Sequence, residues 1–92
     1  MERNQAEILA IRVMEWLATD NDKMRRFLAS TGMTLTEIRT QLDNPDVLAS
    51  VLDFLLLDDR EITEFCRTSG YRPEAPMQAR HALPGGDSPH WL

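Results

Sequence analysis

The chain contains a single cysteine, Cys66, and few aromatic side chains, which make up 7% of its 92 residues. One cysteine excludes a disulfide within the chain and favours a reducing cytoplasm over an oxidising compartment. Basic residues are scarce relative to acidic ones, ten against fifteen, so the formal net charge is −5. This charge disfavours binding to nucleic acid, whose phosphates Lys and Arg must neutralise, and to anionic membranes.

The chain also lacks an apolar run long enough to span a bilayer. Its most apolar stretch, residues 47–57, has nine apolar residues out of eleven and contains Asp53. A membrane-spanning helix needs roughly 20 mainly apolar residues. The N-terminal sequence MERNQAEILA does not have the long uncharged apolar run of a signal peptide. We therefore expect a cytoplasmic protein that does not associate with membranes.

Motifs for catalysis, metal binding and phosphate binding are missing as well. His81 and His90 belong neither to H-E-x-x-H nor to a Cys/His zinc pattern. Cys66 occupies an apolar helical position beside Phe65, so we interpret it as a core residue rather than a nucleophile. The LPGGD segment lacks the pattern of a phosphate-binding loop. The sequence predicts a non-enzymatic protein with no cofactor and no metal.

Helix signals, by contrast, fill most of the chain. Apolar residues recur at helical spacing, and no segment alternates apolar and polar residues long enough to form a strand. Residues suited to helix starts and ends punctuate this pattern, namely Asp58, Asn44 before Pro45, Thr34 with Glu37, Gly32 and Gly70. We predict an all-α fold, a compact bundle of five or six short helices in one domain over residues 1–83. A flexible Pro/Gly tail is expected over residues 84–92.

The two halves of the chain are similar in sequence. Residues 8–33 align without a gap with residues 46–71, an offset of 38, and five aligned positions are identical. The identities include Asp20 with Asp58 and Gly32 with Gly70, so the helix-capping residues agree in register with the apolar positions. The alignment predicts two related three-helix units. Five identities are compatible with a duplication and also with the general likeness of capped amphipathic hairpins.

The fourth predicted helix, which follows Asn44, is expected at the centre of the core. On a helical wheel its apolar side chains cover an arc of roughly 200°, about twice the width seen on an ordinary surface helix. Leu57 falls outside this arc on the polar strip, and Ile8 occupies the equivalent of a polar position in the first helix, about residues 5–18. Leu57 and Ile8 are therefore candidate contacts with a protein partner, although single exposed apolar residues are also common without a function.

The C-terminal segment HALPGGDSPHWL supplies a third candidate partner contact, Trp91. The indole would be an apolar anchor in a docking tail, and a tail without a function is the alternative interpretation. With Ile8 and Leu57, this segment leads us to predict a protein–protein interaction or regulatory module. Its partner would be another protein, not identified by the sequence, or a second copy of the chain.

A DNA-binding regulator is the alternative function. The segment MRRFLASTGMTLTEIRTQL has the outline of a helix-turn-helix, with a glycine in the turn. Arg25, Arg26 and Arg39 would be its nucleic-acid contacts. Residues 23–39 contain four basic residues and one acidic residue, whereas residues 43–64 contain seven acidic residues and one basic residue. This uneven distribution of charge can steer a charged partner, but the overall negative charge disfavours binding to DNA.

Three segments together resemble a known bacterial family. They are RFLASTGMTLTEIR, NPDVLASVLDFLLLDDREITEFC and RPEAPMQARHALPGG, and they cover nearly the whole chain. The patterns FLxxTG and VLDFLLxDD and the ending LPGG resemble the small proteins grouped as domain of unknown function 3572. The resemblance implies a protein of the bacterial cytoplasm. That family brings no activity, cofactor or catalytic residue, so the resemblance implies none here.

Overall fold

The computed structural model describes residues 1–84, which form six α-helices and no β-strand. In chain order the helices are α1 (Arg3–Ala18), α2 (Asn21–Thr31), α3 (Leu35–Thr40), α4 (Pro45–Leu56), α5 (Asp59–Ser69) and α6 (Ala75–His81). The predicted all-α fold is confirmed. α1 begins two residues earlier than expected, because the Gln5 side chain accepts a hydrogen bond from the Glu2 N–H and caps the helix start.

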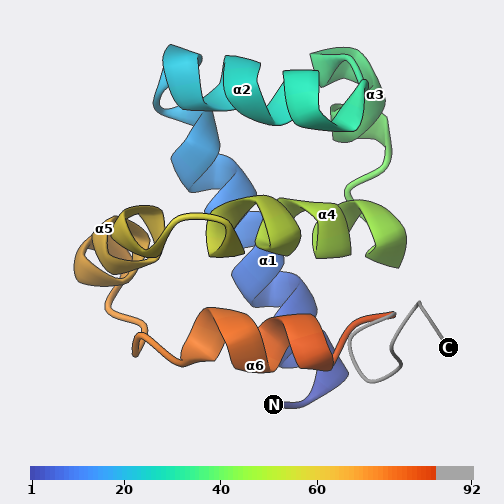
Figure 1. Cartoon of the computed structure of the whole chain (residues 1–92). Coiled ribbons are helices and arrows are strands. Elements are labelled where there is room, and N and C mark those ends of the chain that lie inside the picture. Colours follow the sequence, from blue (N-terminus) through green and yellow to red (C-terminus); the bar gives the residue numbers. More distant parts are fainter. Residues whose placement is uncertain (85–92) are drawn as a thin grey trace, which may run out of the picture.

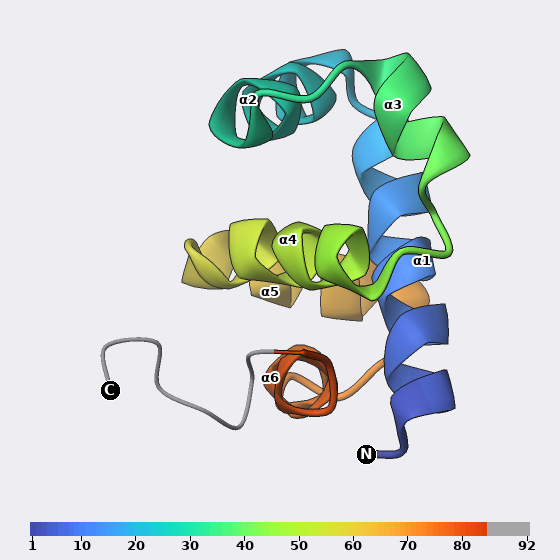
Figure 2. The ribbon, with the colours of Figure 1, turned by 90° about the vertical axis from the view of Figure 1, so that its right-hand side faces the viewer.

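α1 runs behind α2, α4 and α6, which lie one above another across it (Figure 1). The view turned by 90° shows the same order along α1 (Figure 2). The central helix, α4, packs against α1, α2, α5 and α6. The radius of gyration of 12.4 Å is close to the value of roughly 12 Å expected for a compact chain of this length.

The predicted capping residues mark the helix ends. The carboxylates of Asp20 and Asp58 each accept a hydrogen bond of 2.9 Å from the N–H two residues further on, and Asn44 does the same for α4. Gly32 ends α2 with φ of 73°, and Gly70 ends α5 with φ of 85°. These left-handed conformations favour glycine because it has no Cβ.

The two halves agree at these caps but differ in the place of their third helix. α6 packs on both α1 and α4, whereas α3 lies at the opposite end of the molecule with α2 (Figure 1). α3 is also the only helix without an extensive packing interface with another helix of the described chain. The shared caps show similar local geometry, and a common origin of the two halves stays a prediction.

α4 supplies the centre of the core, as its wide apolar arc predicts. Its buried side chains are Val47, Leu48, Ala49, Val51, Leu52 and Leu55. Aromatic rings join the surrounding helices. Phe27 of α2 meets Phe54 of α4 edge to face at 5.4 Å, and Trp16 of α1 meets Phe65 of α5 at 5.7 Å. These contacts fix α2 and α5 relative to the central pair of helices.

Cys66 is a core residue, as predicted. Its side chain is buried, and its Sγ lies 3.5 Å from the carbonyl oxygen of Arg72. Burial raises the pKa of the Cys66 thiol, with a smaller contribution from Glu74. The neutral thiol therefore dominates near pH 7, which is the opposite of what a nucleophilic cysteine needs.

Several apolar side chains that pack against the core are only half-buried. They include Leu28, Leu35, Leu42 and Ile62. Leu35 is the first residue of the short helix α3 and Leu42 follows its end; α3 has six residues and fully buries only Ile38. A helix of this length cannot cover the end of α1 completely, so it leaves a pocket beneath itself.

Candidate functional site

Leu57 is the most exposed large apolar residue of the described chain, with 80% of its surface accessible. It is the C-terminal cap residue of α4 and stands directly before Asp58, which caps α5. Its position outside the core is the one that the helical wheel predicts. A role in binding a partner stays a prediction.

A hollow of about 350 Å³ adjoins Leu57 between the end of α2 and the outer side of α4. Its lining residues are Ser30, Thr31, Met33, Ser50, Asp53, Phe54 and Leu57. Met33 and Phe54 are half-buried there. The hydroxyl groups of Ser30 and Thr31 donate to carbonyl groups of α2, so the rim is polar but already hydrogen-bonded. We call Met33, Phe54 and Leu57 the Leu57 surface.

One wall of this hollow is held by an ion pair between helices far apart in sequence. Arg80 Nε of α6 lies 2.6 Å from Asp53 Oδ1 of α4, and the same guanidinium donates to the Pro84 carbonyl oxygen at 2.9 Å. The Arg80 side chain is only 13% exposed, so this charge-assisted contact is partly shielded from water. It fixes α6 and the end of the described chain against α4.

Of the three predicted partner contacts, the two that the structure describes, Ile8 and Leu57, line different hollows. Ile8 is 45% exposed and lines a separate hollow of about 310 Å³ with Met1, Gln5 and Tyr71. Trp91 lies outside the described residues, as does His90. His81 is exposed at the end of α6.

The three arginines of the DNA-binding alternative also lie in different surroundings. Arg25 and Arg26 of α2 pair with Asp22 at 3.8 and 3.5 Å, and Arg26 also approaches Glu61 at 4.0 Å. Arg39 belongs to α3 and lines a pocket instead. Carboxylates next to the α2 arginines reduce their attraction for phosphate.

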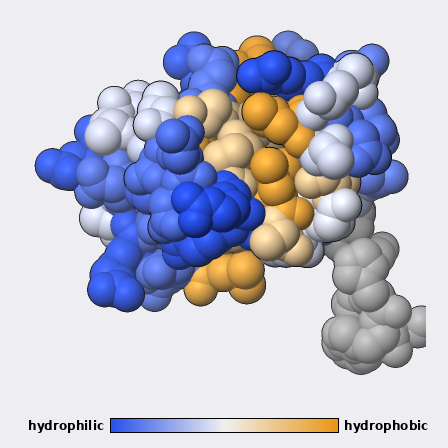
Figure 3. All heavy atoms as spheres, turned by 90° about the horizontal axis from the view of Figure 1, so that it is seen from above, coloured by the Kyte–Doolittle hydropathy of each residue, from blue (hydrophilic) through white to orange (hydrophobic). Residues whose placement is uncertain are grey.

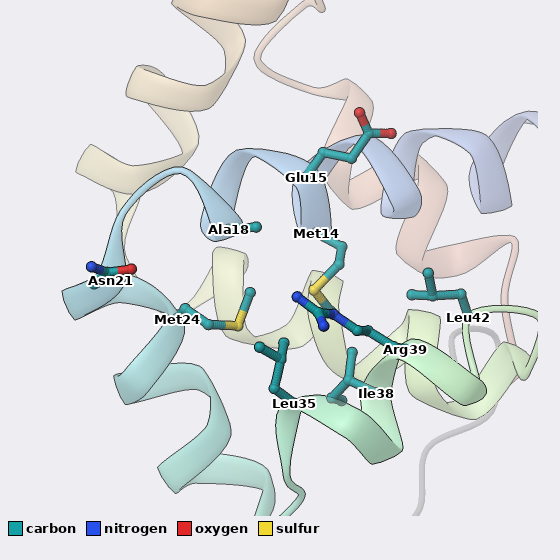
Figure 4. Close-up of a pocket in the computed structure, with 9 residues that line it drawn as sticks. All are labelled: Met14, Glu15, Ala18, Asn21, Met24, Leu35, Ile38, Arg39 and Leu42. Atoms are coloured by element: carbon teal, nitrogen blue, oxygen red, sulfur yellow. The ribbon is translucent and has the colours of Figure 1, made fainter.

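That pocket, which we call the α3 pocket, lies between α1, α2 and α3 and has a volume of about 320 Å³. Its lining residues are Met14, Glu15, Ala18, Asn21, Met24, Leu35, Ile38, Arg39 and Leu42 (Figure 4). On the face at the α2 and α3 end of the molecule, apolar side chains form a band bordered by hydrophilic ones (Figure 3). The sequence did not indicate this pocket. Its only local signal is the shortness of the predicted third helix.

The lowered carboxyl pKa values in the chain arise from helix capping. The Thr34 N–H donates to the Glu37 carboxylate at 3.0 Å, and this bond, with one involving the Thr34 side chain, lowers the pKa of Glu37. The pKa of Asp20 is lowered mainly by the hydrogen bond from the Lys23 N–H. The hydrogen bonds that cause both pKa shifts stabilise helix starts, so the shifts do not indicate a catalytic acid or base.

Residues 1–84 contain neither a metal-binding cluster nor a membrane-spanning helix. No three His, Cys, Asp or Glu side chains of this part of the chain lie close enough together to hold a metal ion. None of the helices formed by these residues is both long and apolar enough to cross a membrane.

Comparisons with known proteins agree with the resemblance seen in the sequence. Neither the curated proteins nor the solved structures gave a match. The family described as protein of unknown function (DUF3572) matches residues 3–86, which is nearly the whole chain and includes all six helices. On this evidence the chain belongs to the DUF3572 family.

Proposed function

We propose that this protein is a non-enzymatic interaction module of the bacterial cytoplasm and that it binds a protein partner through the Leu57 surface. The observation that carries the proposal is the 80% exposure of Leu57 beside a hollow walled by Met33 and Phe54. Burying a leucine side chain stabilises a complex by roughly 1.5–3 kcal/mol. Most of the binding energy of an interface comes from a few side chains that become fully desolvated in well-packed pockets, and Leu57 is placed to become one of them.

The charges around Leu57 suggest the chemistry of the partner. Asp59 is exposed and has no ion pair within residues 1–84, and Asp58, the neighbour of Leu57, meets only the exposed Arg60 at 3.8 Å. Asp53, in contrast, is already neutralised by Arg80. A partner with an apolar residue surrounded by Lys or Arg would complement this acidic setting and associate faster at low salt.

The test is affinity capture of partners with three full-length proteins, the wild type, Leu57→Glu and Ile8→Glu. We expect Leu57→Glu to weaken the capture of a wild-type partner by at least roughly tenfold, because a charge replaces the apolar anchor. Ile8→Glu changes another exposed apolar residue in the same way and should retain that partner. If Leu57→Glu retains every partner of the wild type, the proposal is wrong.

Two measurements distinguish the other outcomes. Sedimentation velocity over a range of protein concentrations detects self-association, and Leu57→Glu should abolish it if the partner is a second copy. Titration of duplex DNA at low salt examines the DNA-binding alternative, for which binding should weaken steeply as the salt concentration rises.

A further inference from the structure

The α3 pocket is separate from the Leu57 surface and has the composition of a small-molecule site. Its volume of about 320 Å³ lies at the lower end of the range of roughly 300–1,000 Å³ found for ligand pockets. Most of its lining is apolar, and its floor includes the buried residues Met14, Met24 and Ile38. Thioether side chains adapt their shape and are polarizable, so they accommodate alkyl chains and aromatic rings equally well.

Arg39 gives this apolar pocket a positive charge. The chain has ten Lys and Arg residues, and within the described part of the chain only Arg12 and Arg39 have no carboxylate partner. Figure 4 shows the Arg39 side chain reaching from α3 into the space between Met14, Met24 and Leu35. The carboxylate of Glu15, in contrast, points away from this space. The guanidinium therefore lies over apolar surface without an anion to balance it.

An unpaired guanidinium beside an apolar cavity is complementary to a molecule with an apolar body and a carboxylate. The planar guanidinium donates two parallel hydrogen bonds to a carboxylate. Arg39 is exposed, so the carboxylate of a ligand would lie at the mouth of the pocket and its apolar part inside. The cover of the pocket is α3, the helix without an extensive packing interface. Because α3 has few contacts with the other helices, it should adjust to a ligand more easily than they do.

From this arrangement we propose that the α3 pocket binds a small apolar monocarboxylate, such as a medium-chain fatty acid or an arylalkanoic acid. The alkyl or aryl part packs against Met14, Met24 and Ile38, and the carboxylate pairs with Arg39. This site does not depend on the Leu57 surface, so either proposal can fail while the other holds.

The five methionines of the chain provide the test. Their methyl groups are labelled with ¹³C, and the full-length protein is titrated with octanoate below its micelle concentration. We expect saturable shifts of the Met14 and Met24 methyl signals, while Met33 and Met77, which lie outside the pocket, stay in place. Similar shifts at all methionines would indicate nonspecific association, and an absence of shifts would indicate no site, so both results would overturn the proposal.

The role of Arg39 is tested with a charge variant and a neutral probe. Arg39→Met keeps an unbranched apolar side chain but removes the charge, and we expect it to weaken octanoate binding roughly tenfold. Binding of 1-octanol, which has no carboxylate, should not change between the two proteins. If the wild type binds octanol as tightly as octanoate, the pocket does not recognise carboxylates and the proposal is wrong.

A third variant tests the location of the site. Ala18→Phe adds a large side chain to the exposed wall of the pocket and should block octanoate binding. Ala29→Phe is the matched control, because Ala29 is equally an exposed helical alanine but does not line the pocket. Circular dichroism of all variants checks the fold. Octanoate binding that survives Ala18→Phe would place the ligand elsewhere.

Discussion

Single capping residues determine where several of the helices begin and end. Gly32 and Gly70 end the two equivalent helices α2 and α5 in the left-handed conformation, and Asp20 and Asp58 begin them. Each cap satisfies backbone groups that the helix itself leaves without partners. Since the bonds join residues two to four positions apart, the residue types alone are enough to locate them.

Gly32→Ala tests the conformational basis of the cap. A Cβ at this position would meet no atom within 4 Å, so any loss of stability arises from the φ of 73° alone. We expect a loss of about 1 kcal/mol in the free energy of unfolding, measured by urea denaturation. Gly32→Asn should cost less, because asparagine tolerates the left-handed region. Equal stability of Gly32→Ala and the wild type would contradict this explanation.

Among the elements, α3 differs from the other five helices. It has six residues, buries only Ile38 fully, and depends on the capping box between Thr34 and Glu37 at its start. α4, in contrast, is surrounded by four helices. α3 should therefore open locally at a lower free energy than α4.

The pH dependence of α3 provides a test of its capping box. Folding lowers the pKa of Glu37 below its usual value of 4.5. Its contribution to helix stability is therefore complete above pH 4.5 and is lost as the pH falls through the lowered value. Hydrogen-exchange protection of the α3 amides should fall in that pH range before protection of α4 does. Glu37→Gln keeps the hydrogen-bond acceptor without the titration, and it should remove this difference between acid and neutral pH.

At the scale of the whole molecule, α4 supplies the centre of the core, whereas Leu57, the residue that follows it, faces outward. Leu52 of α4 is 0% exposed and Leu57 is 80% exposed, although they are five positions apart and share the same side chain. Lys23 of α2 forms an ion pair of 3.0 Å with Glu61 of α5, and its ammonium group also lies over the Trp16 ring of α1. These two contacts of Lys23 hold α5 against α1 and α2. The structure therefore separates a buried apolar core from an apolar side chain that is exposed at the surface.

Leu52→Ala and Leu57→Glu should accordingly differ strongly in their effect on the free energy of unfolding. Leu52→Ala leaves a cavity between packed helices, and we expect it to lower the free energy of unfolding by about 2–5 kcal/mol. Leu57→Glu should change it by no more than about 0.5 kcal/mol, because the side chain is in water in both states. Thermal and urea denaturation measure both values. A large loss in Leu57→Glu would show that Leu57 supports the fold rather than a partner surface.

Much of the fold could be predicted from the sequence because the relevant interactions are local. The helix count, the caps, the central place of α4 and the exposure of Leu57 all follow from residue types within a few positions of each other. Less of the candidate site could be predicted from the sequence. Leu57 was predicted, but its neighbours Met33 and Phe54 and the hollow between them were not.

The sequence by itself determined where the helices begin and end and which face of each is apolar, because capping and periodicity act over one or two turns. Only the tertiary structure decided which faces meet. It joined Asp53 to Arg80 across 27 positions, and it brought the exposed Arg39, a nucleic-acid contact only under the alternative function, next to the apolar lining of the α3 pocket. Such contacts depend on how six helices pack together, and packing is settled by the whole set of side chains rather than by any one segment.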